Sequence, residues 1–475
     1  MLARLVRVVL PLVCVGAIAS LPAQQDASPP PVEVTVHEPL ELLCVVARFA
    51  GHPEYQPRTP EPAYSKSVAK HFAAGREHDA VARLRELRRA HGIGYDAIAS
   101  LAVHLGPLPE LAPLVPFAPH PPSLDARWRD ADPAAFVATL RQFASATDAE
   151  AFFASNRRLY ERAAERLAER LQDSDALPWF DEFFGARPGA RCIAHVGLQC
   201  GGHNYGTSVR SLDGGIDQLR PVFGCWRFDQ DGTPRFGAEL LPLFVHELCH
   251  TWVNPIVEQH LERLSPAGER LFCAHAEVMQ RQAYGNGRTL LCETLVRACV
   301  IRCVTDTDGE AAGRKQAAQE TRAHFTWAPE LAELLRDYQR DRERYATFEA
   351  FVPKLAEALD RIAARFPAVD DAAPQLVACS PANGSTDVDP ALRELRFTFD
   401  RAMADQSWSV VGDPAQMPKL LGSPEYDRAR RVLTIRVELE GGRDYRFSLN
   451  SPDKQGFRSE RGAPLAPVVV TFRTR

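Results

Sequence analysis

The sequence predicts an α+β protein, in which a mostly helical domain with a small β-sheet precedes an all-β sandwich. Residues 66–92 and 132–175 are rich in alanine, arginine, glutamate and leucine, with apolar residues at helical spacing. Residues 190–236 instead carry short apolar runs broken by glycines, which is typical of a small sheet. Helical patterns resume from 239 to about 366, and from 376 the chain alternates short strands with turns.

The first residues have the pattern of a secretory signal peptide. Arg4 and Arg7 precede an apolar run, and Ala23 is the small residue before a polar segment. The run is short for a membrane span, although an uncleaved anchor is the alternative. We therefore expect residues 1–23 to be removed from an exported bacterial protein, secreted or periplasmic, that has no membrane span after cleavage.

Net charge and the distribution of arginines limit the kinds of partner that the chain is expected to bind. The formal net charge is −5 and the arginines are spread beside glutamates along helices, so we expect no nucleic-acid partner. Eleven cysteines are present, and export permits disulfides, but their connectivity cannot be read from the sequence.

Two polar, proline-containing stretches set the expected domain boundaries. Residues 24–35 and 366–375 are expected to be linkers, which leaves one domain at 36–366 and the sandwich at 376–475. Within the first domain, Asp229–Thr233 (DQDGT) is typical of a hairpin turn. A metal site at Asp229 and Asp231 is weakly indicated, because the further oxygen ligands of a calcium loop do not follow.

The chemistry of the chain is concentrated in HELCH, residues 246–250. His246 and His250 are four residues apart, so a helix stacks them on one face, where both imidazoles can reach one metal ion. Glu247 is offset by one residue and can reach a metal-bound water instead. This is the HExxH motif of zinc peptidases. The neighbouring face of the same helix is an apolar stripe: Leu241, Phe244, Val245, Leu248 and Trp252. A buried helix with a satisfied histidine pair is the alternative.

A catalytic zinc needs a third protein ligand and an open position. The extended motif with a third histidine fails, because Ile256 stands where that histidine would be. Glu293 is favoured, since it lies 43 residues beyond His250 on a separate predicted helix, whereas the metal helix is expected to end near Pro255. The other acidic and histidine side chains considered are Glu258, His260, Glu262, His275 and Glu277.

The motif implies a mechanism for peptide hydrolysis. Zn²⁺ would lower the pKa of its water to near neutrality and polarise the scissile carbonyl, and Glu247 would act as general base. The oxyanion needs a further donor. Tyr205 is favoured because a glycine-flanked strand before the metal helix suits an edge that pairs with an extended peptide. The alternatives are Tyr284, His275, His203 and Arg297.

These motifs resemble an uncharacterised bacterial family known only as a domain of unknown function. VHELCHTWVNP (245–255) and AYGNGRTLLCETLVRACVIR (283–302) carry the likeness, which extends through weaker pieces over roughly residues 36–360. The resemblance implies a gluzincin-like metallopeptidase with zinc ligands His246, His250 and Glu293. Many gluzincins carry an acidic residue soon after the glutamate ligand; this chain does not, and Asn254 or a backbone carbonyl is the expected substitute.

The C-terminal stretch, with SPANGSTDV (380–388) and FTFDRAM (397–403), resembles bacterial Ig-like domains of exported proteins. The resemblance implies a spacer or a module that contacts the cell surface or other proteins.

The leading hypothesis for the whole chain is an exported zinc peptidase acting on peptides or proteins. The alternatives are a non-catalytic binding protein on a zincin fold and a zinc amidohydrolase with a non-peptide substrate.

Overall fold

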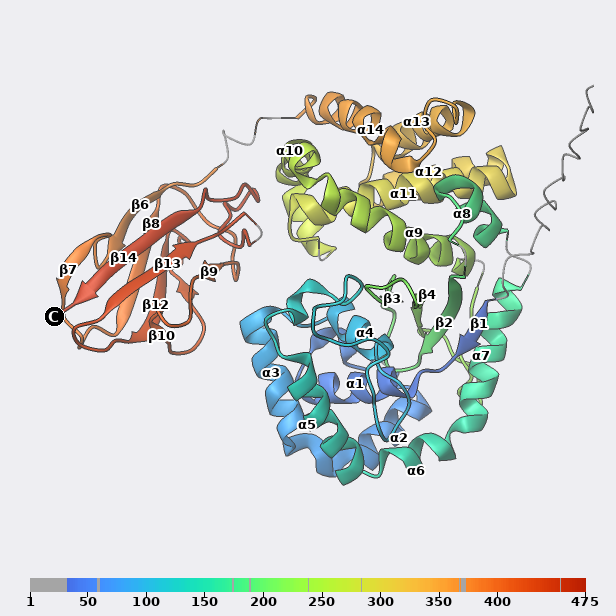
Figure 1. Cartoon of the computed structure of the whole chain (residues 1–475), viewed down its shortest axis with the longest axis horizontal. Coiled ribbons are helices and arrows are strands. Elements are labelled where there is room, and N and C mark those ends of the chain that lie inside the picture. The colour runs from blue at the N-terminus through green and yellow to red at the C-terminus, as the bar shows by residue number, and fades with distance from the viewer. Residues whose placement is uncertain are drawn as a thin grey trace, which may run out of the picture.

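The computed structural model describes residues 32–475 except 58–59, 173–174, 188, 238, 283, 367, 369–372 and 453 (Figure 1). The predicted signal peptide at 1–23 and most of the linker predicted at 24–35 lie outside the described residues. The fold is α+β, with a helical N-terminal region and an all-β C-terminal region, as the sequence predicts.

Helices α1 to α7 form the lower layer of the helical region in Figure 1. The longest apolar run, in Glu38–Phe49, becomes the central helix α1, because a helix buried on all sides needs no polar face. The layer contains α1 (Glu38–Phe49), α2 (Ala63–His71), α3 (Asp79–His91), α4 (Asp96–Val103), α5 (Pro133–Ala146), α6 (Ala149–Ser155) and α7 (Arg157–Leu171). Three short 3-10 turns interrupt it at Pro53–Tyr55, Phe72–Glu77 and Ala126–Trp128.

A small mixed sheet joins this layer, in the order β1-β2-β4-β3 with β5 also paired to β2. β1, β4 and β5 run parallel to β2, and β3 runs antiparallel to β4. Its strands are β1 (Glu33–Thr35), β2 (Arg191–Gly197), β3 (Ser208–Arg210), β4 (Asp217–Leu219) and β5 (Val222–Gly224). β1 falls inside the stretch predicted as a linker: its backbone pairs with Ile193–His195 of β2, which polar composition does not reveal.

The upper layer is built around one helix, α11, which packs mainly against α9, α10, α12 and α13 and also touches α8. Because neighbours surround it, α11 is buried on nearly every face and has no single apolar stripe. The layer contains α8 (Ala176–Phe184), α9 (Leu240–Gln259), α10 (Leu261–Arg281), α11 (Gly287–Asp308), α12 (Glu310–Arg322), α13 (Ala328–Arg340) and α14 (Phe348–Ala363).

Helix α9 carries the HExxH motif and lies between the rest of the upper layer and the sheet (Figure 1). The prediction that it ends near Pro255 is wrong, because the helix continues to Gln259. Proline removes one backbone donor but keeps a helical φ. The extra turn buries Val257 completely, which offsets the lost hydrogen bond.

The C-terminal region is a sandwich of two sheets, ordered β10-β12-β8-β6 with β11 on β12, and β7-β14-β13-β9. Its strands are β6 (Leu376–Ser380), β7 (Ser385–Val388), β8 (Glu394–Phe399), β9 (Val410–Val411), β10 (Lys419–Leu420), β11 (Glu425–Tyr426), β12 (Val432–Glu438), β13 (Asp444–Leu449) and β14 (Val468–Thr474). Strand alternation buries Leu395, Phe397 and Phe399 of β8 in a core separate from that of the helical region.

The sandwich touches the helical region at α10. Arg458 donates from Nη1 to Oε2 of Glu269 at 2.9 Å, and its guanidinium lies 5.4 Å from the Phe272 ring centroid. Gly462 sits against Phe272 with φ +83°, so a side chain there would be strained and would overlap the ring.

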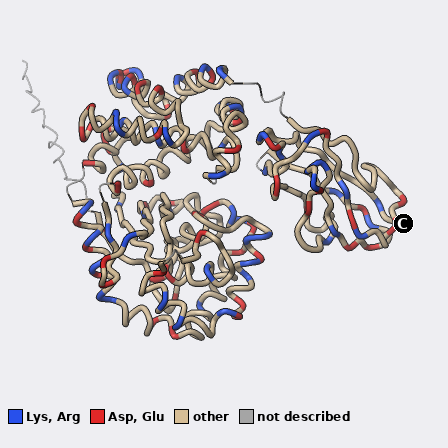
Figure 2. Tube along the Cα trace, turned by 180° about the vertical axis from the view of Figure 1, so that it is seen from behind, with Lys and Arg blue, Asp and Glu red and all other residues tan. Residues whose placement is uncertain are grey.

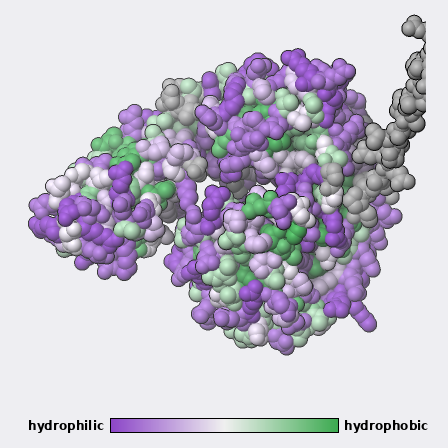
Figure 3. Space-filling model, in the orientation of Figure 1, coloured by the Kyte–Doolittle hydropathy of each residue, from purple (hydrophilic) through white to green (hydrophobic). Residues whose placement is uncertain are grey.

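Surface charge is mixed, as Figure 2 shows, with acidic and basic residues interspersed along the helices. Hydrophobic residues are visible in Figure 3 on the lower layer, along its border with the helices above. Within the residues that the structure describes, no helix has the length and apolarity needed to span a membrane.

Candidate metal centre

Helix geometry places the two histidines of the motif together. Phe244, Leu248 and Cys249 are fully buried in the core, which fixes the rotation of α9 and turns His246 and His250 to a neighbouring face. The two imidazole Nε2 atoms are 3.3 Å apart. The sequence prediction that one helix face presents both rings is confirmed.

Glu293 reaches the same point from α11. Asn286 caps this helix by accepting a hydrogen bond from the Thr289 N–H at 2.8 Å, so the helix begins at Gly287, within the YGNGR stretch. Glu293 is only 7% exposed. Its Oε2 lies 3.6 Å from His246 Nε2 and its Oε1 lies 3.4 Å from His250 Nε2. Two helices that are distant in the chain thus bring three ligand groups together.

These spacings fit a zinc ion. Tetrahedral bonds of about 2.1 Å place neighbouring ligand atoms about 3.4 Å apart. The two Nε2 atoms are 3.3 Å apart, and each lies close to a different oxygen of Glu293: His250 is 3.4 Å from Oε1 and His246 is 3.6 Å from Oε2. Two imidazoles and one carboxylate are also a donor set of catalytic zinc sites, with the fourth position left open. Among the described residues, His246, His250 and Glu293 form the one group of three whose ligand atoms could hold a metal ion.

Partners outside the ligand set hold His250. Its Nδ1–H donates to Oδ1 of Asn254 at 3.1 Å, which leaves Nε2 directed at the ligand cluster. Burial alone would lower the pKa of His250, but the carboxylates of Glu293 and Glu247 outweigh it and raise that pKa to about 9. Asn254 therefore serves as the hydrogen-bond partner of His250, the role that an acidic residue has in many gluzincins. It is one of the two partners expected from the sequence, the other being a backbone carbonyl.

Glu293 is held by an ion-pair network. Tyr284 donates from Oη to Oε2 of Glu293 at 3.1 Å, and Arg297 donates from Nη2 to Tyr284 Oη at 2.9 Å. Arg297 also pairs with Glu320 of α12 and lies over the Phe325 ring. Burial opposes the charge of Glu293, but His246, His250 and Arg297 together lower its pKa below the usual range. Its carboxylate is thus kept ionised for a cation.

The two remaining groups of the motif differ in charge state. Burial raises the pKa of Glu247 to about 7, although His250 opposes the shift. Burial also lowers the pKa of His246 to about 3, against the attraction of Glu293, so this imidazole is neutral. A neutral imidazole is the form that binds a metal.

A cavity of about 960 Å³ opens beside these groups. His246, Glu247 and Arg297 lie in its wall, between α9, α11 and α12. Glu247 is 6% exposed, so its carboxylate faces the cavity from a largely buried position. The volume is large enough for several residues of an extended peptide.

Tyr205, the predicted oxyanion donor, lies elsewhere. Its neighbour Gly206 packs so closely on α9 that a Cβ would overlap the Glu247 carbonyl oxygen. Tyr205 therefore points to the opposite side, where its hydroxyl is buried near Tyr55 and Cys200 and where burial raises its pKa. The prediction is corrected: Tyr284 is the tyrosine whose hydroxyl contacts a ligand of the cluster.

The other residues considered are also placed away from the cluster. Glu258 pairs with Arg288, His260 lies 3.5 Å from Glu349, and Glu277 pairs with Arg281. His275 accepts ring contacts from Trp327 and Phe366, and His203 stacks edge-on with Tyr95. No contact of Glu262 with the cluster is found among the described residues.

Two further outcomes concern the acidic turn and the cysteines. The DQDGT turn forms, with the Asp229 N–H donating to the Thr233 carbonyl at 2.8 Å. Asp231 accepts from Thr233, and Asp229 pairs with Arg166 and Arg235, so both carboxylates of the weakly indicated metal site have protein partners.

The ten described cysteines are free thiols, of which Cys44 and Cys200 approach within 3.6 Å.

Sequence reasoning missed Glu320 as part of the site. This residue is buried on α12 and accepts from Arg297, one step removed from the ligand cluster. Its only sequence signal is a glutamate four residues after Gln316 on a helix, a spacing that is common on solvated helix faces.

Comparisons with known proteins place two domains in the chain. Residues 125–358 match the family model described as "Domain of unknown function (DUF4932)", and residues 370–474 match "Bacterial Ig-like domain". No match was found among curated proteins.

Solved structures give a much weaker likeness. The crystal structure of the S-layer protein rSbsC(31-844) is 13% identical and covers 49% of this chain and 33% of its own, with a TM-score of 0.17. Domains 1-6 of the surface layer protein SbsC are 15% identical over the same shares, with a TM-score of 0.16. The chain thus spans about a third of the length of these structures, and the likeness carries no argument.

Proposed function

We propose that this chain, which carries a DUF4932 domain followed by a bacterial Ig-like domain, is an exported zinc-dependent peptidase. The observation that carries the proposal is the spacing of three ligand groups. His246, His250 and Glu293 meet at separations that suit a tetrahedral zinc, beside a cavity that Glu247 also faces. The HExxH motif and the gluzincin-like origin of Glu293 point to the same chemistry.

Zn²⁺ held by these ligands would supply Lewis acidity toward a scissile carbonyl and toward water. Glu247 then acts as general base. It takes a proton from the attacking water and transfers it to the leaving amine, from a position next to both histidines. Its burial at 6% exposure keeps bulk water away, so the carboxylate has few competing partners.

Tyr284 and Arg297 position the proposed third ligand, Glu293, and Arg297 also lines the cavity. Tyr284 holds Oε2 of Glu293, while Arg297 fixes Tyr284 and lines the cavity. The Tyr284 hydroxyl is the group on this side that can turn a donor toward an oxyanion during hydrolysis. Since Arg297 also pairs with Glu320, the guanidinium is held in place before substrate arrives.

Two features support export. The first 23 residues have the pattern of a signal peptide, and bacterial Ig-like domains are the type found on exported proteins. We propose a secreted or periplasmic location and a peptide or protein substrate. Mass spectrometry of the mature N-terminus tests the location, and an intact Met1 on the protein would count against cleavage.

Zinc content and hydrolysis together test the activity. Glu293→Ala should lose zinc, whereas Glu277→Ala is a matched control because that glutamate is exposed and pairs with Arg281 on its own helix. Glu247→Gln should keep zinc and lose turnover of a peptide library. Equal zinc in wild type and Glu293→Ala would remove Glu293 as a ligand, and retained hydrolysis in Glu247→Gln would remove the general base.

The same digest separates the alternatives. A protein that binds zinc and library peptides without cutting them is the non-catalytic binding protein on a zincin fold. One that binds zinc and hydrolyses simple amides, but no peptide, is the amidohydrolase.

A further inference from the structure

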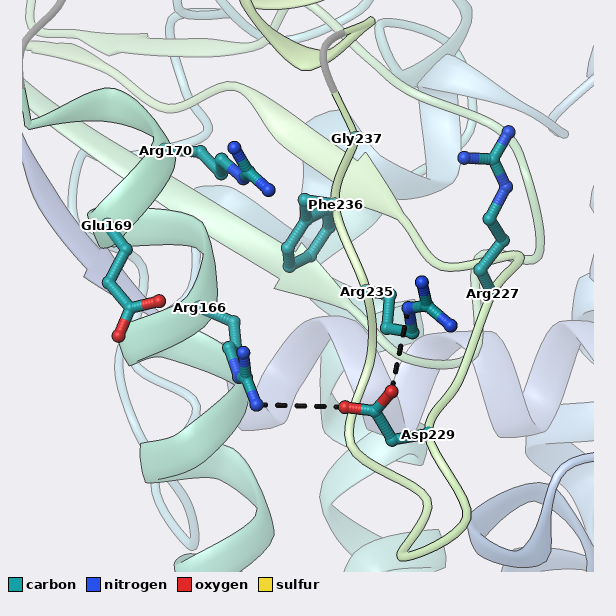
Figure 4. A pocket seen from close by; sticks show the side chains of 8 residues that line it. All are labelled: Arg166, Glu169, Arg170, Arg227, Asp229, Arg235, Phe236 and Gly237. Carbon is teal, nitrogen blue, oxygen red and sulfur yellow. Dashed lines mark ion pairs between the residues drawn. The ribbon is translucent and has the colours of Figure 1, made fainter.

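A second cavity adjoins the one beside the metal cluster. Its volume is about 630 Å³, and its walls come from α7 and the loop between β5 and α9 (Figure 4). The two cavities share Glu169, Arg170 and Gly237 in their walls, so they lie next to each other at these residues. We call this second cavity the arginine pocket. The residues that line it are Arg166, Glu169, Arg170, Arg227, Asp229, Arg235, Phe236 and Gly237.

Positive charge is in excess in the arginine pocket, where four arginines face two carboxylates. Asp229 is shared between Arg166 at 3.7 Å and Arg235 at 3.5 Å, both longer than a hydrogen bond. Arg227 pairs with Glu239 at 3.0 Å, at the edge of the first cavity. Among the residues that the structure describes, several guanidinium donors are therefore left without a close acceptor.

Arg170 is the residue best placed to bind a ligand. It lines both cavities and has no ion pair with any residue that the structure describes. Figure 4 shows Arg166 and Arg170 extending from α7 toward the loop that carries Phe236 and Asp229, whereas Glu169 extends away from that loop. The electrostatic potential in the space between α7 and the loop is consequently positive, because the arginine side chains dominate it.

We propose that the arginine pocket binds a carboxylate of the substrate peptide, either an acidic side chain or the C-terminal carboxylate. A planar guanidinium binds a carboxylate through two parallel hydrogen bonds, which a neutral amide cannot replace. The Phe236 ring beside Arg170 gives an apolar wall for the methylenes of such a side chain (Figure 4). A peptide lying along the first cavity past Glu247 continues into this pocket through the shared wall at Arg170 and Gly237. This inference rests on the proposed function, because it names the substrate class of the same site.

Matched peptides test the preference. The probes are eight-residue peptides with a neutral N-terminal fluorophore, in pairs that carry Glu or Gln at one position, and a further pair with a free or amidated C-terminus. Wild type is expected to prefer the carboxylate member of one pair by about tenfold in kcat/KM, because the charge-assisted pairs form near solvent. The side-chain pairs and the C-terminal pair separate the two sources of the carboxylate.

Arg170→Ala should reduce that preference to near unity, and Arg170→Glu should invert it. Arg158→Ala is the control, since Arg158 is an exposed arginine of the same helix outside both cavities. The preference should also shrink as salt is raised from about 0.05 to 0.5 M, because the screening length falls. Equal turnover of both members of every pair by wild type overturns the proposal, as does an unchanged preference in Arg170→Ala.

Binding to the Glu247→Gln protein separates this proposal from the proposed function. Fluorescence anisotropy with the same peptides requires no hydrolysis. If wild type cleaves nothing but Glu247→Gln still prefers the carboxylate peptides through Arg170, the peptidase assignment fails and the arginine pocket stands. If cleavage occurs with no carboxylate preference in either assay, the pocket assignment fails and the peptidase stands.

Discussion

Two buried, histidine-rich regions of the helical domain differ in what their side chains share. In the metal cluster, His246 and His250 aim their Nε2 atoms at one point with Glu293. In the lower layer, His37 and His195 instead stack face to face, with ring centroids 4.8 Å apart. Both regions bury imidazoles and carboxylates, so burial of titratable groups does not by itself mark a site.

Convergence and access make the difference. The stacked pair presents ring faces to each other, His37 donates from Nε2–H to the Ala102 carbonyl oxygen at 2.9 Å, and neither cavity described above reaches the pair. Burial lowers the pKa of both rings, so they remain neutral core residues. In the metal cluster the two Nε2 atoms and the Glu293 carboxylate converge on a shared point beside open volume, which is the geometry that a ligand requires.

The largest expected effect breaks the metal cluster. His246→Ala or His250→Ala should lose bound zinc and reduce peptide hydrolysis by about a thousandfold or more, because two ligands are too few to hold the ion. His324→Asn is the control, since this exposed histidine lies at φ +71°, which asparagine tolerates. Metal analysis of the purified proteins and initial rates measure both effects. Full zinc in either alanine variant would contradict the ligand assignment.

Local patterns explain why the convergence of His246, His250 and Glu293 could be predicted. Helical spacing alone stacks His246 on His250, and the separate helix that carries Glu293 is announced by the glycine-rich turn before it. The strands of the sandwich were likewise readable from alternation, as Leu395, Phe397 and Phe399 show.

Long-range packing explains the failures. Tyr205 was predicted as the oxyanion donor from its place in an expected strand. The close contact of Gly206 with α9 instead decides which way the adjacent Tyr205 side chain points. Glu320 joins the site only because α12 packs on α11, and β1 pairs with a strand about 160 residues away. No periodicity in the sequence encodes these contacts.

The next largest effect should be on kcat, with zinc content unchanged, and comes from Tyr284. Tyr284→Phe should lower kcat by about a hundredfold with little change in KM, if its hydroxyl donates to developing charge. Zinc content should stay near that of wild type, since Arg297 still lies 3.5 Å from Glu293. The control is Tyr205→Phe, whose hydroxyl is remote from the cluster and should leave kcat unchanged. Equal loss in the two variants would argue for a packing effect.

A smaller effect concerns the orientation of one ligand. Asn254→Ala removes the acceptor for His250 Nδ1, so zinc affinity should fall about tenfold, as measured by competition with a chelator. Asn254→Asp keeps an acceptor oxygen in place and should restore most of that affinity. A similar loss in both variants would show that Asn254 acts through helix packing.

The last prediction concerns Glu41 in the lower layer, where a substitution should change stability but leave the metal cluster unaffected. Glu41 is fully buried on α1, where its Oε1 accepts from the Leu198 N–H at 2.7 Å, and burial raises its pKa to about 8. The folded protein holds the proton that the unfolded chain releases above the ordinary pKa of 4.5. The contribution of Glu41 to stability is therefore full below pH 4.5 and is lost as the pH rises toward 8.

Glu41→Gln should flatten this dependence, because the amide carries no proton to lose. Thermal unfolding from pH 5 to 8 should show the variant gaining several degrees on wild type across the range, which corresponds to a few kcal/mol. Oε2 of Glu41 has no hydrogen-bond partner among the described residues, so the amide N–H₂ adds an offset that does not change with pH. The slope is thus the quantity to compare. Parallel profiles would mean that Glu41 is ionised in the folded protein, and zinc content should match wild type throughout, since this carboxylate belongs to the core.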